Sequence, residues 1–142
     1  MMIRFVFPFR FFFVKIALAY SQLGKHDVAI SRAKRGVELS GGSTKVEAGL
    51  GIVQARAGNK GEAEKIIAKL LRNADTKNVS PQDIALIYSA IGDREKAFEW
   101  LEKSYEERTP WLIELNIDPV FDAIRDDPRF HDLAKRVGLD KR

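Results

Sequence analysis

Apolar residues recur at spacings of three and four along three stretches of the chain, and polar residues fill the positions between them. In the first and third stretches the apolar positions are Phe13, Ile16, Tyr20 and Leu23, and Ile84, Ile87, Tyr88 and Ile91. This spacing places side chains on one face of an α-helix. Each stretch runs into a short turn that contains glycine, after which a second helical pattern begins. The pattern therefore predicts an all-α protein built from pairs of helices joined by turns.

The helix pairs repeat with a period of 34 residues and without an insertion. The turn glycines, and the alanines that follow each of them by five positions, are Gly24 and Ala29, Gly58 and Ala63, and Gly92 and Ala97. Glycine ends a helix because it accepts the left-handed conformation, and alanine is small enough to let two helices cross closely. We therefore divide residues 10–108 into three repeats, which are in register at 10–43, 44–77 and 78–111.

Short polar residues mark the expected helix starts. Asp27, Asn59 and Asp93 stand near the start of the second helix of each repeat, where their side chains can cap free N–H groups. Ser80 and Pro81 open the third repeat, with serine as N-cap and proline at the first helical position. These signals support the proposed division into helix pairs.

The repeated positions resemble the tetratricopeptide repeat, whose signature is W-x2-L-G-x2-Y, then A-x3-F, then P. The matching positions in the first and third repeats are Phe13, Ile16, Ala17, Tyr20, Ala29 and Ala33, and Pro81, Ile84, Ala85, Tyr88, Ala97 and Leu101. The second repeat departs most, because Glu47 and Gln54 stand where large apolar residues are usual, and Gly49 and Gly51 lie inside its first helix. The resemblance implies a short right-handed superhelical solenoid that acts as a non-enzymatic protein-interaction module.

Residues 109–142 do not continue the repeat, and we interpret them as C-terminal capping helices. Thr109, Asp118 and Asp127 each precede a proline, a pattern typical of an N-cap followed by the first helical residue. The apolar residues expected to cover the last repeat are Trp111, Leu115, Phe121, Ile124, Phe130 and Leu133. The stretch "DPVFDAIRDDPRFHDL" resembles the C-terminal repeat-and-cap module of bacterial multidomain regulators. That resemblance implies an interaction or sensing module that lacks the activity of the effector.

Residues 1–9 form an atypical apolar lead-in, and six of the nine phenylalanines lie within the first 13 residues. A membrane anchor or signal peptide is the less favoured alternative, because Arg4, Arg10 and Lys15 interrupt the apolar run. We expect the first helix to cover residues 10–23 and the chain to be a fragment of a larger repeat array. The phenylalanines then either cover the open face of the first repeat or drive self-association into a homo-oligomer.

The net charge of +4 hides an asymmetry between the two halves of the chain. The segments 1–43 and 44–77 carry +5 and +3, whereas 78–111 and 112–142 carry −3 and −1. A partner can use such a gradient for orientation, although a solvated surface can also carry it without a role. The chain has no cysteine, which excludes disulfides and thiolate catalysis and fits a reducing cytoplasm.

The sequence offers no constellation for catalysis, a cofactor or a metal ion. His26 and His131 are the only histidines, and neither has a metal-ligand spacing. The adjacent acidic pairs at 106–107 and 126–127 point in different directions on a helix, which does not suit an acid–base dyad. The "SGGS" loop lacks the lysine of a phosphate-binding loop. We expect no enzyme, no cofactor and no nucleic-acid partner, since the basic half also lacks a recognition surface.

An acidic stripe runs along the second helix of the third repeat. It consists of Glu95, Glu99, Glu102 and Glu106, which follow one another at helical spacing. Its simplest interpretation is a solvated outer face, and the alternative is an acidic docking surface.

In the family that the chain resembles, the first helices of the repeats line a concave groove that takes a partner peptide or helix. The matching positions here, which we take as candidate binding residues, are Val14, Leu18, Ser21, Gln22, Ala48, Ile52, Arg56, Gln82, Leu86 and Ser89. They do not match the relatives that clamp a terminal carboxylate, apart from Arg56. A mostly apolar groove suits an amphipathic partner segment or the chain's own tail. Alternatively, these residues pack between neighbouring repeats.

Overall fold

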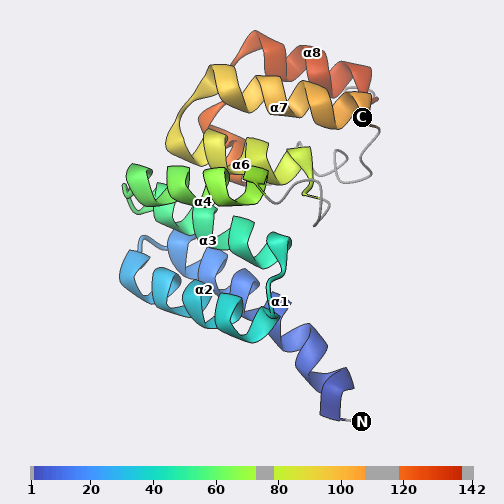
Figure 1. Ribbon diagram of the computed structural model, residues 1–142. Helices are drawn as coiled ribbons and strands as arrows, with labels where there is room; N and C mark the ends of the chain where they lie inside the picture. The colour runs from blue at the N-terminus through green and yellow to red at the C-terminus, as the bar shows by residue number, and fades with distance from the viewer. Residues whose placement is uncertain (1, 73–78, 108–118, 139–142) are drawn as a thin grey trace. The chain divides into compact units, whose positions relative to one another are not determined.

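The computed structural model of the chain describes residues 2–72, 79–107 and 119–138, with side chains from residue 12 onward (Figure 1). Its elements are α1 (Met2–Gln22), α2 (His26–Ser40), α3 (Thr44–Arg56), α4 (Lys60–Arg72), α6 (Pro81–Ile91), α7 (Arg94–Glu106), the 3-10 helix η2 (Pro119–Ala123) and α8 (Pro128–Arg136). No strand occurs in these described ranges. The all-α prediction is therefore confirmed over them, whereas the right-handed superhelical solenoid stays a prediction.

The chain divides into two compact units, unit 1 (Met1–Val79) and unit 2 (Ser80–Arg142). Unit 1 holds α1 to α4, and unit 2 holds α6, α7, η2 and α8. The boundary falls just before the N-cap of α6, two residues into the third predicted repeat (78–111). We describe each unit by itself.

The 34-residue spacing of the helices extends into the C-terminal segment. The helices α2, α4, α7 and α8 begin at His26, Lys60, Arg94 and Pro128, so each starts 34 residues after the one before. The repeat's glycine and alanine positions are replaced there by Asp126 and His131. The sequence motif therefore stops, as predicted, while the spacing of the helices continues.

Small residues bring the helices of unit 1 close together. Its core cluster consists of Ala17, Ala29, Ala33 and Val53, each fully buried. A Cβ added to Gly49 in α3 would lie 2.7 Å from Cγ1 of Val14 in α1. The valine is β-branched and stiff at χ1, so this contact explains why a helix-weakening glycine occupies the position.

The two polar residues that made the second repeat atypical each have a partner within unit 1. Gln54 is 5 % exposed, and its Oε1 accepts a hydrogen bond from Nδ2 of Asn59 at 2.8 Å. Glu47 forms an ion pair with Nζ of Lys69 at 2.6 Å, which joins α3 to α4. Both polar groups are therefore compensated where the family more often places apolar side chains.

The turn glycines adopt the predicted left-handed conformation. Of the expected N-cap residues, only some make a capping hydrogen bond. Gly24, Gly58 and Gly92 all have positive φ, between 76° and 93°. Asp93 caps α7, because its side chain accepts a hydrogen bond from the backbone N–H of Lys96.

Three of the expected caps differ from the prediction. Lys25 is the N-cap of α2, so Asp27 lies two residues too late to cap it. Asn59 directs its amide to Gln54 instead of to the start of α4. Ser80 is the N-cap of α6, with Pro81 next to it, but its side chain makes no capping hydrogen bond.

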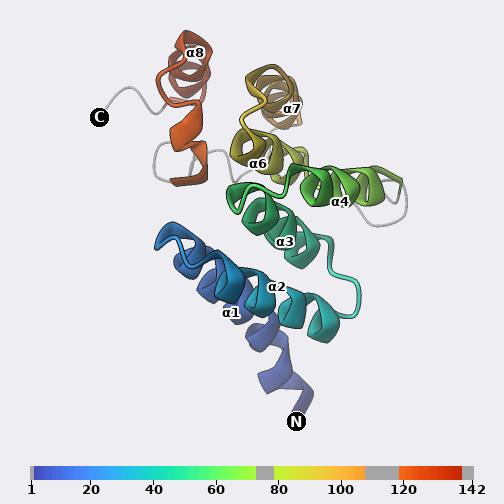
Figure 2. The ribbon, with the colours of Figure 1, turned by 90° about the vertical axis from the view of Figure 1, so that its left-hand side faces the viewer.

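The first helix starts earlier than predicted. It begins at Met2 instead of residue 10, so the apolar lead-in is part of α1. Two views at right angles show the first turns of α1 extending past the end of α2 (Figures 1 and 2). The repeat pattern could not place this start, because residues 1–9 have no counterpart in the register.

In unit 2, η2 packs against α6, and α8 packs against α7. Four of the apolar residues predicted to cover the last repeat are buried: Phe121, Ile124, Phe130 and Leu133. The rings of Phe121 and Phe130 lie 6.2 Å apart at 56°. The other predicted contributors, Trp111 and Leu115, and the predicted caps Thr109 and Asp118 lie outside the described residues.

Candidate functional site

The predicted groove residues of unit 1 differ in exposure. Ser21, Ala48 and Ile52 are buried, at 3 %, 1 % and 5 % exposure. Val14 is half-buried against Gly49, and Leu18 packs against the core cluster. These residues contribute to packing between helices, which is one of the two alternatives that the sequence left open.

Gln22 and Arg56 are the predicted groove residues of unit 1 that the structure brings together at the surface. Nη2 of Arg56 on α3 donates a hydrogen bond to Oε1 of Gln22 on α1, at 3.0 Å. Nη1 of Arg56 is buried and has no hydrogen-bond partner among the described residues. A guanidinium presents five N–H donors, so Arg56 keeps donors for another acceptor. The two residues are 34 apart, which shows that equivalent positions of successive repeats lie side by side.

In unit 2 the chain's own C-terminal segment lies against part of the predicted groove. Gln82, Leu86 and Ser89 on α6 are all buried. Oγ of Ser89 donates a hydrogen bond to the backbone carbonyl of Val120 in η2, at 2.9 Å. Ser89 thus contacts the chain's own C-terminal segment, whereas occupancy of the groove as a whole stays a prediction. Oε1 of Gln82 is buried without a partner among the described residues.

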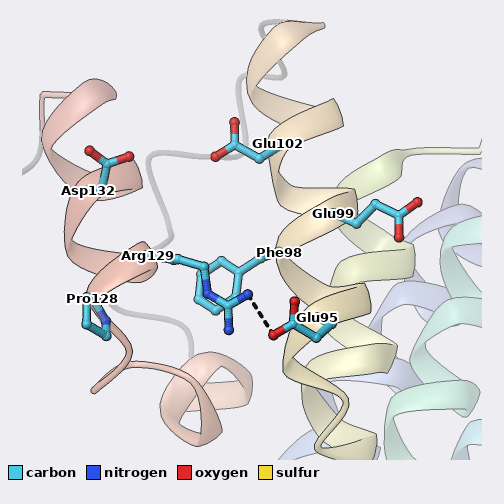
Figure 3. A pocket seen from close by; sticks show the side chains of 7 residues that line it. All are labelled: Glu95, Phe98, Glu99, Glu102, Pro128, Arg129 and Asp132. Atoms are coloured by element: carbon cyan, nitrogen blue, oxygen red, sulfur yellow. Dashed lines mark hydrogen bonds and ion pairs between the residues drawn. The ribbon is translucent and has the colours of Figure 1, made fainter.

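A second surface feature is a hollow of about 550 Å³ between α7 and α8, which we call the α7–α8 groove. It is lined by Glu95, Phe98, Glu99, Glu102, Pro128, Arg129 and Asp132. Arg129 reaches from α8 towards α7, where its guanidinium lies 4.5 Å from the centre of the Phe98 ring (Figure 3). Its Nη1 donates to Oε1 of Glu95 at 2.9 Å (Figure 3). The groove thus combines carboxylates, one aromatic ring and one guanidinium.

Asp127 organises the start of α8, as its position before a proline predicted. As the N-cap residue it accepts a hydrogen bond from the backbone N–H of Arg129 at 2.9 Å. The Arg129 guanidinium donates to both carboxylate oxygens of Asp127, at 3.0 and 2.9 Å. These hydrogen bonds hold the pKa of the Asp127 carboxyl well below its usual range and raise the pKa of Arg129. The pair is therefore fully charged at neutral pH.

Arg136 makes a second link between α8 and α7. It donates to both carboxylate oxygens of Glu102 and, within α8, to Asp132 at 2.9 Å. Its guanidinium also lies 4.9 Å from the centre of the Tyr105 ring. The hydrogen bond from Arg136 lowers the pKa of the Glu102 carboxyl.

The acidic stripe of α7 is therefore only partly the solvated outer face that we expected. Glu95 and Glu102 face α8 and pair there with Arg129 and Arg136. These pairs were not predicted from the sequence, although each joins residues 34 apart. Charge complementarity at the repeat spacing was the signal that could have found them.

Among the residues that the structure describes, nothing supports a catalytic or metal-binding site. No group of three or more histidine, cysteine, aspartate or glutamate side chains is placed there to hold a metal ion. His131 is exposed on α8, and His26 begins α2 with its Nδ1 buried. None of the described helices is long and apolar enough to span a membrane.

The comparison with protein families matches residues 82–108 to the tetratricopeptide repeat. The match covers α6 and α7, which form the third predicted repeat. The comparison with curated proteins found no match, and neither did the comparison with solved structures. Repeats of this family generally act as scaffolds for protein–protein interaction. On this match and on the helical fold of the described residues, the chain contains a tetratricopeptide repeat at residues 82–108.

Proposed function

We propose that the chain is a non-enzymatic protein-interaction module that binds a partner segment on the α1–α3 face of unit 1. The observation that carries this proposal is the contact between Gln22 and Arg56, two residues that the groove pattern singles out. Nη1 of Arg56 is buried, but the residue is partly exposed and uses one of its five N–H donors on Gln22 at the surface. A carboxylate or backbone carbonyl of a partner would accept from the remaining exposed donors.

The neighbouring residues suggest what the partner segment looks like. Leu18 lies one helical turn before Gln22 on the same face of α1 and is half-buried. An apolar side chain of the partner beside Leu18, with an acceptor group placed towards Arg56, would engage both. We therefore expect a short segment with an apolar residue close to an acidic one.

The contact between Ser89 and Val120 in unit 2 supports this mode of binding. There the first helix of a repeat holds a short non-α-helical segment through a side-chain hydrogen bond to a backbone carbonyl. Apolar side chains of the same segment, Val120 and Phe121, are buried. Unit 2 thus offers an intramolecular example of the kind of contact that we propose for a partner on unit 1.

Selection from a random peptide library tests the proposal. We expect the wild-type chain to select peptides with micromolar dissociation constants. The substitution Arg56→Gln should weaken their binding at least tenfold, because it removes the charge and the free donor. The matched control is Arg72→Gln, since Arg72 is exposed at the end of α4. Equal binding to wild type and Arg56→Gln, with unchanged helicity, would contradict the proposal.

A second candidate function is self-association through the N-terminal end of α1. It is favoured by Phe12, which is 57 % exposed, and by the first turns of α1, which extend past α2 (Figure 1). An exposed phenylalanine beside an unaccompanied helix end favours burial against another surface. Deleting residues 1–9 should then convert an oligomer into a soluble monomer in light scattering. An unchanged oligomeric state would contradict this second function.

A further inference from the structure

We propose that the α7–α8 groove of one copy receives the N-terminal end of α1 from a second copy of the chain. This inference rests on the proposed self-association and adds the surface that receives the helix. It joins two features that lie in different units and that the repeat pattern does not connect.

The donor helix combines basic and aromatic residues. Residues 2–15 contain Arg4, Arg10 and Lys15 and no acidic residue, and the first acidic residue of the chain is Asp27. This part of α1 extends past α2 (Figures 1 and 2), and Phe12 within it is 57 % exposed. This end of the chain is thus basic in sequence, and Phe12 adds exposed apolar surface.

The α7–α8 groove has the complementary composition. Pro128 contributes exposed apolar surface, whereas Phe98 is 5 % exposed and lies beneath the Arg129 guanidinium. The other lining residues include the carboxylates Glu95, Glu102 and Asp132, which remain 44–82 % exposed although each pairs with an arginine of α8. Glu102 and Asp132 project from α7 and α8 on opposite sides of the opening (Figure 3). A hollow between two helices suits a third helix, which is a common mode of peptide recognition. Basic side chains of that helix would add to the arginines that already pair with these carboxylates, while its apolar face covers Pro128.

The charge of the two units explains why the occupant is a second copy. Unit 1 contains fourteen basic and six acidic residues, whereas unit 2 contains ten basic and fourteen acidic residues. Their net charges are therefore +8 and −4. Two copies attract each other when unit 1 of one meets unit 2 of the other, and they repel each other in like-with-like arrangements. The contact is heterologous, so it can build either a closed pair or a longer chain of copies.

Two charge-reversal variants and two matched controls test the inference by sedimentation velocity. The helix variant is Arg10→Glu with Lys15→Glu, and its control Lys60→Glu with Arg72→Glu makes the same charge change on α4. The groove variant is Glu95→Lys with Asp132→Lys, and its control Glu106→Lys with Glu107→Lys lies outside the groove. We expect each test variant to weaken self-association at least tenfold and each control to change it less than threefold.

Mixing the two test variants gives the sharpest result. The helix variant keeps a wild-type groove and the groove variant keeps a wild-type helix, so together they should form a 1:1 complex that grows no further. That outcome also shows that both variants are folded. If the wild type self-associates and the groove variant does so equally well, the α7–α8 groove is not the receiving surface. The proposal of self-association itself is then still supported. If wild type is a monomer up to about 100 µM, both the self-association and this inference are wrong.

Discussion

Unit 1 and unit 2 arrange helices with the same 34-residue spacing but hold them together with different side chains. In unit 1 the buried cluster consists of alanines and a valine, and Val14 packs directly onto Gly49. In unit 2 the core includes the rings of Phe121 and Phe130 beside aliphatic side chains, and arginines of α8 pair with carboxylates of α7. The comparison shows that the spacing of the repeat constrains helix positions while leaving the chemistry of their contacts open.

Two serines at equivalent positions of the repeats also differ between the units in their hydrogen bonding. Ser21 in α1 and Ser89 in α6 are 68 residues apart, which is two periods, and both are buried. Ser89 donates to Val120, whereas Oγ of Ser21 has no partner among the described residues. The Ser89 hydroxyl finds its acceptor in the 3-10 helix η2, whereas the carbonyls inside an α-helix already accept backbone N–H groups. A segment that is not α-helical thus supplies the acceptor in unit 2.

The largest effect is expected for Phe121→Ala. Phe121 is fully buried, and removing a buried phenylalanine costs about 3–5 kcal/mol. Both tryptophans belong to unit 2, so tryptophan fluorescence reports on that unit, while far-UV circular dichroism reports on both. We expect the fluorescence midpoint in urea to fall by at least about 1 M, with part of the dichroism signal unchanged. Phe12→Ala is the control, because an exposed site changes stability by about 0.5 kcal/mol or less.

The serine pair predicts opposite effects of one substitution. Ser89→Ala should lower the free energy of unfolding by about 1–2 kcal/mol, because a buried hydrogen bond is lost. Ser21→Ala should leave it unchanged or raise it, because the substitution removes a buried hydroxyl without a partner. Urea unfolding of both variants measures the difference. Equal destabilisation by the two substitutions would contradict the comparison.

Close packing in unit 1 predicts a smaller effect at Gly49. Gly49→Ala should destabilise by about 1 kcal/mol, because strain against Val14 outweighs the gain in helix propensity. Adding Val14→Ala should remove that strain, so the effects of the two substitutions are not additive. Gly61→Ala on α4 is the control, since an added Cβ meets nothing within 4 Å there. We expect this control to be neutral or stabilising in thermal unfolding.

The smallest effect concerns the pH dependence of unit 2. The folded-state pKa of Asp127 is lowered by Arg129, so its carboxylate stabilises unit 2 fully above the ordinary aspartate pKa of about 3.9. That contribution is lost progressively as the pH falls below this value. Asp127→Asn keeps a side chain that can cap α8 but removes the charge. The stability difference between wild type and Asp127→Asn should narrow from pH 6 to pH 3, and a constant difference would contradict the account.

Part of this structure could be predicted from the sequence because local signals determine it. The positive φ of Gly24 and Gly92, the cap at Asp127 and the burial of Phe121 all follow from residue type and spacing. The pair of Gln54 and Asn59 and the early start of α1 could not be predicted in this way. The first depends on a side-chain partner across a turn, and the second lies outside the repeated register.

The candidate sites were predicted less completely than the fold. The groove pattern identified Gln22 and Arg56 but could not separate them from buried neighbours such as Ile52. Periodicity indicates which face of a helix is apolar, and it does not indicate which neighbouring helix covers that face. The α7–α8 groove was missed for the same reason, because an acidic stripe alone does not reveal the arginines opposite it.

The measurement that tests the central claim most directly is the mass of the wild-type chain by light scattering, across a tenfold dilution and at two salt concentrations. The opposite charges of the two units predict a mass above 16.1 kDa at about 50 mM salt, which falls on dilution and approaches the monomer value at about 0.5 M salt. A mass of 16.1 kDa under every condition would contradict self-association. Association that strengthens with salt would contradict its electrostatic basis and would indicate apolar contact instead.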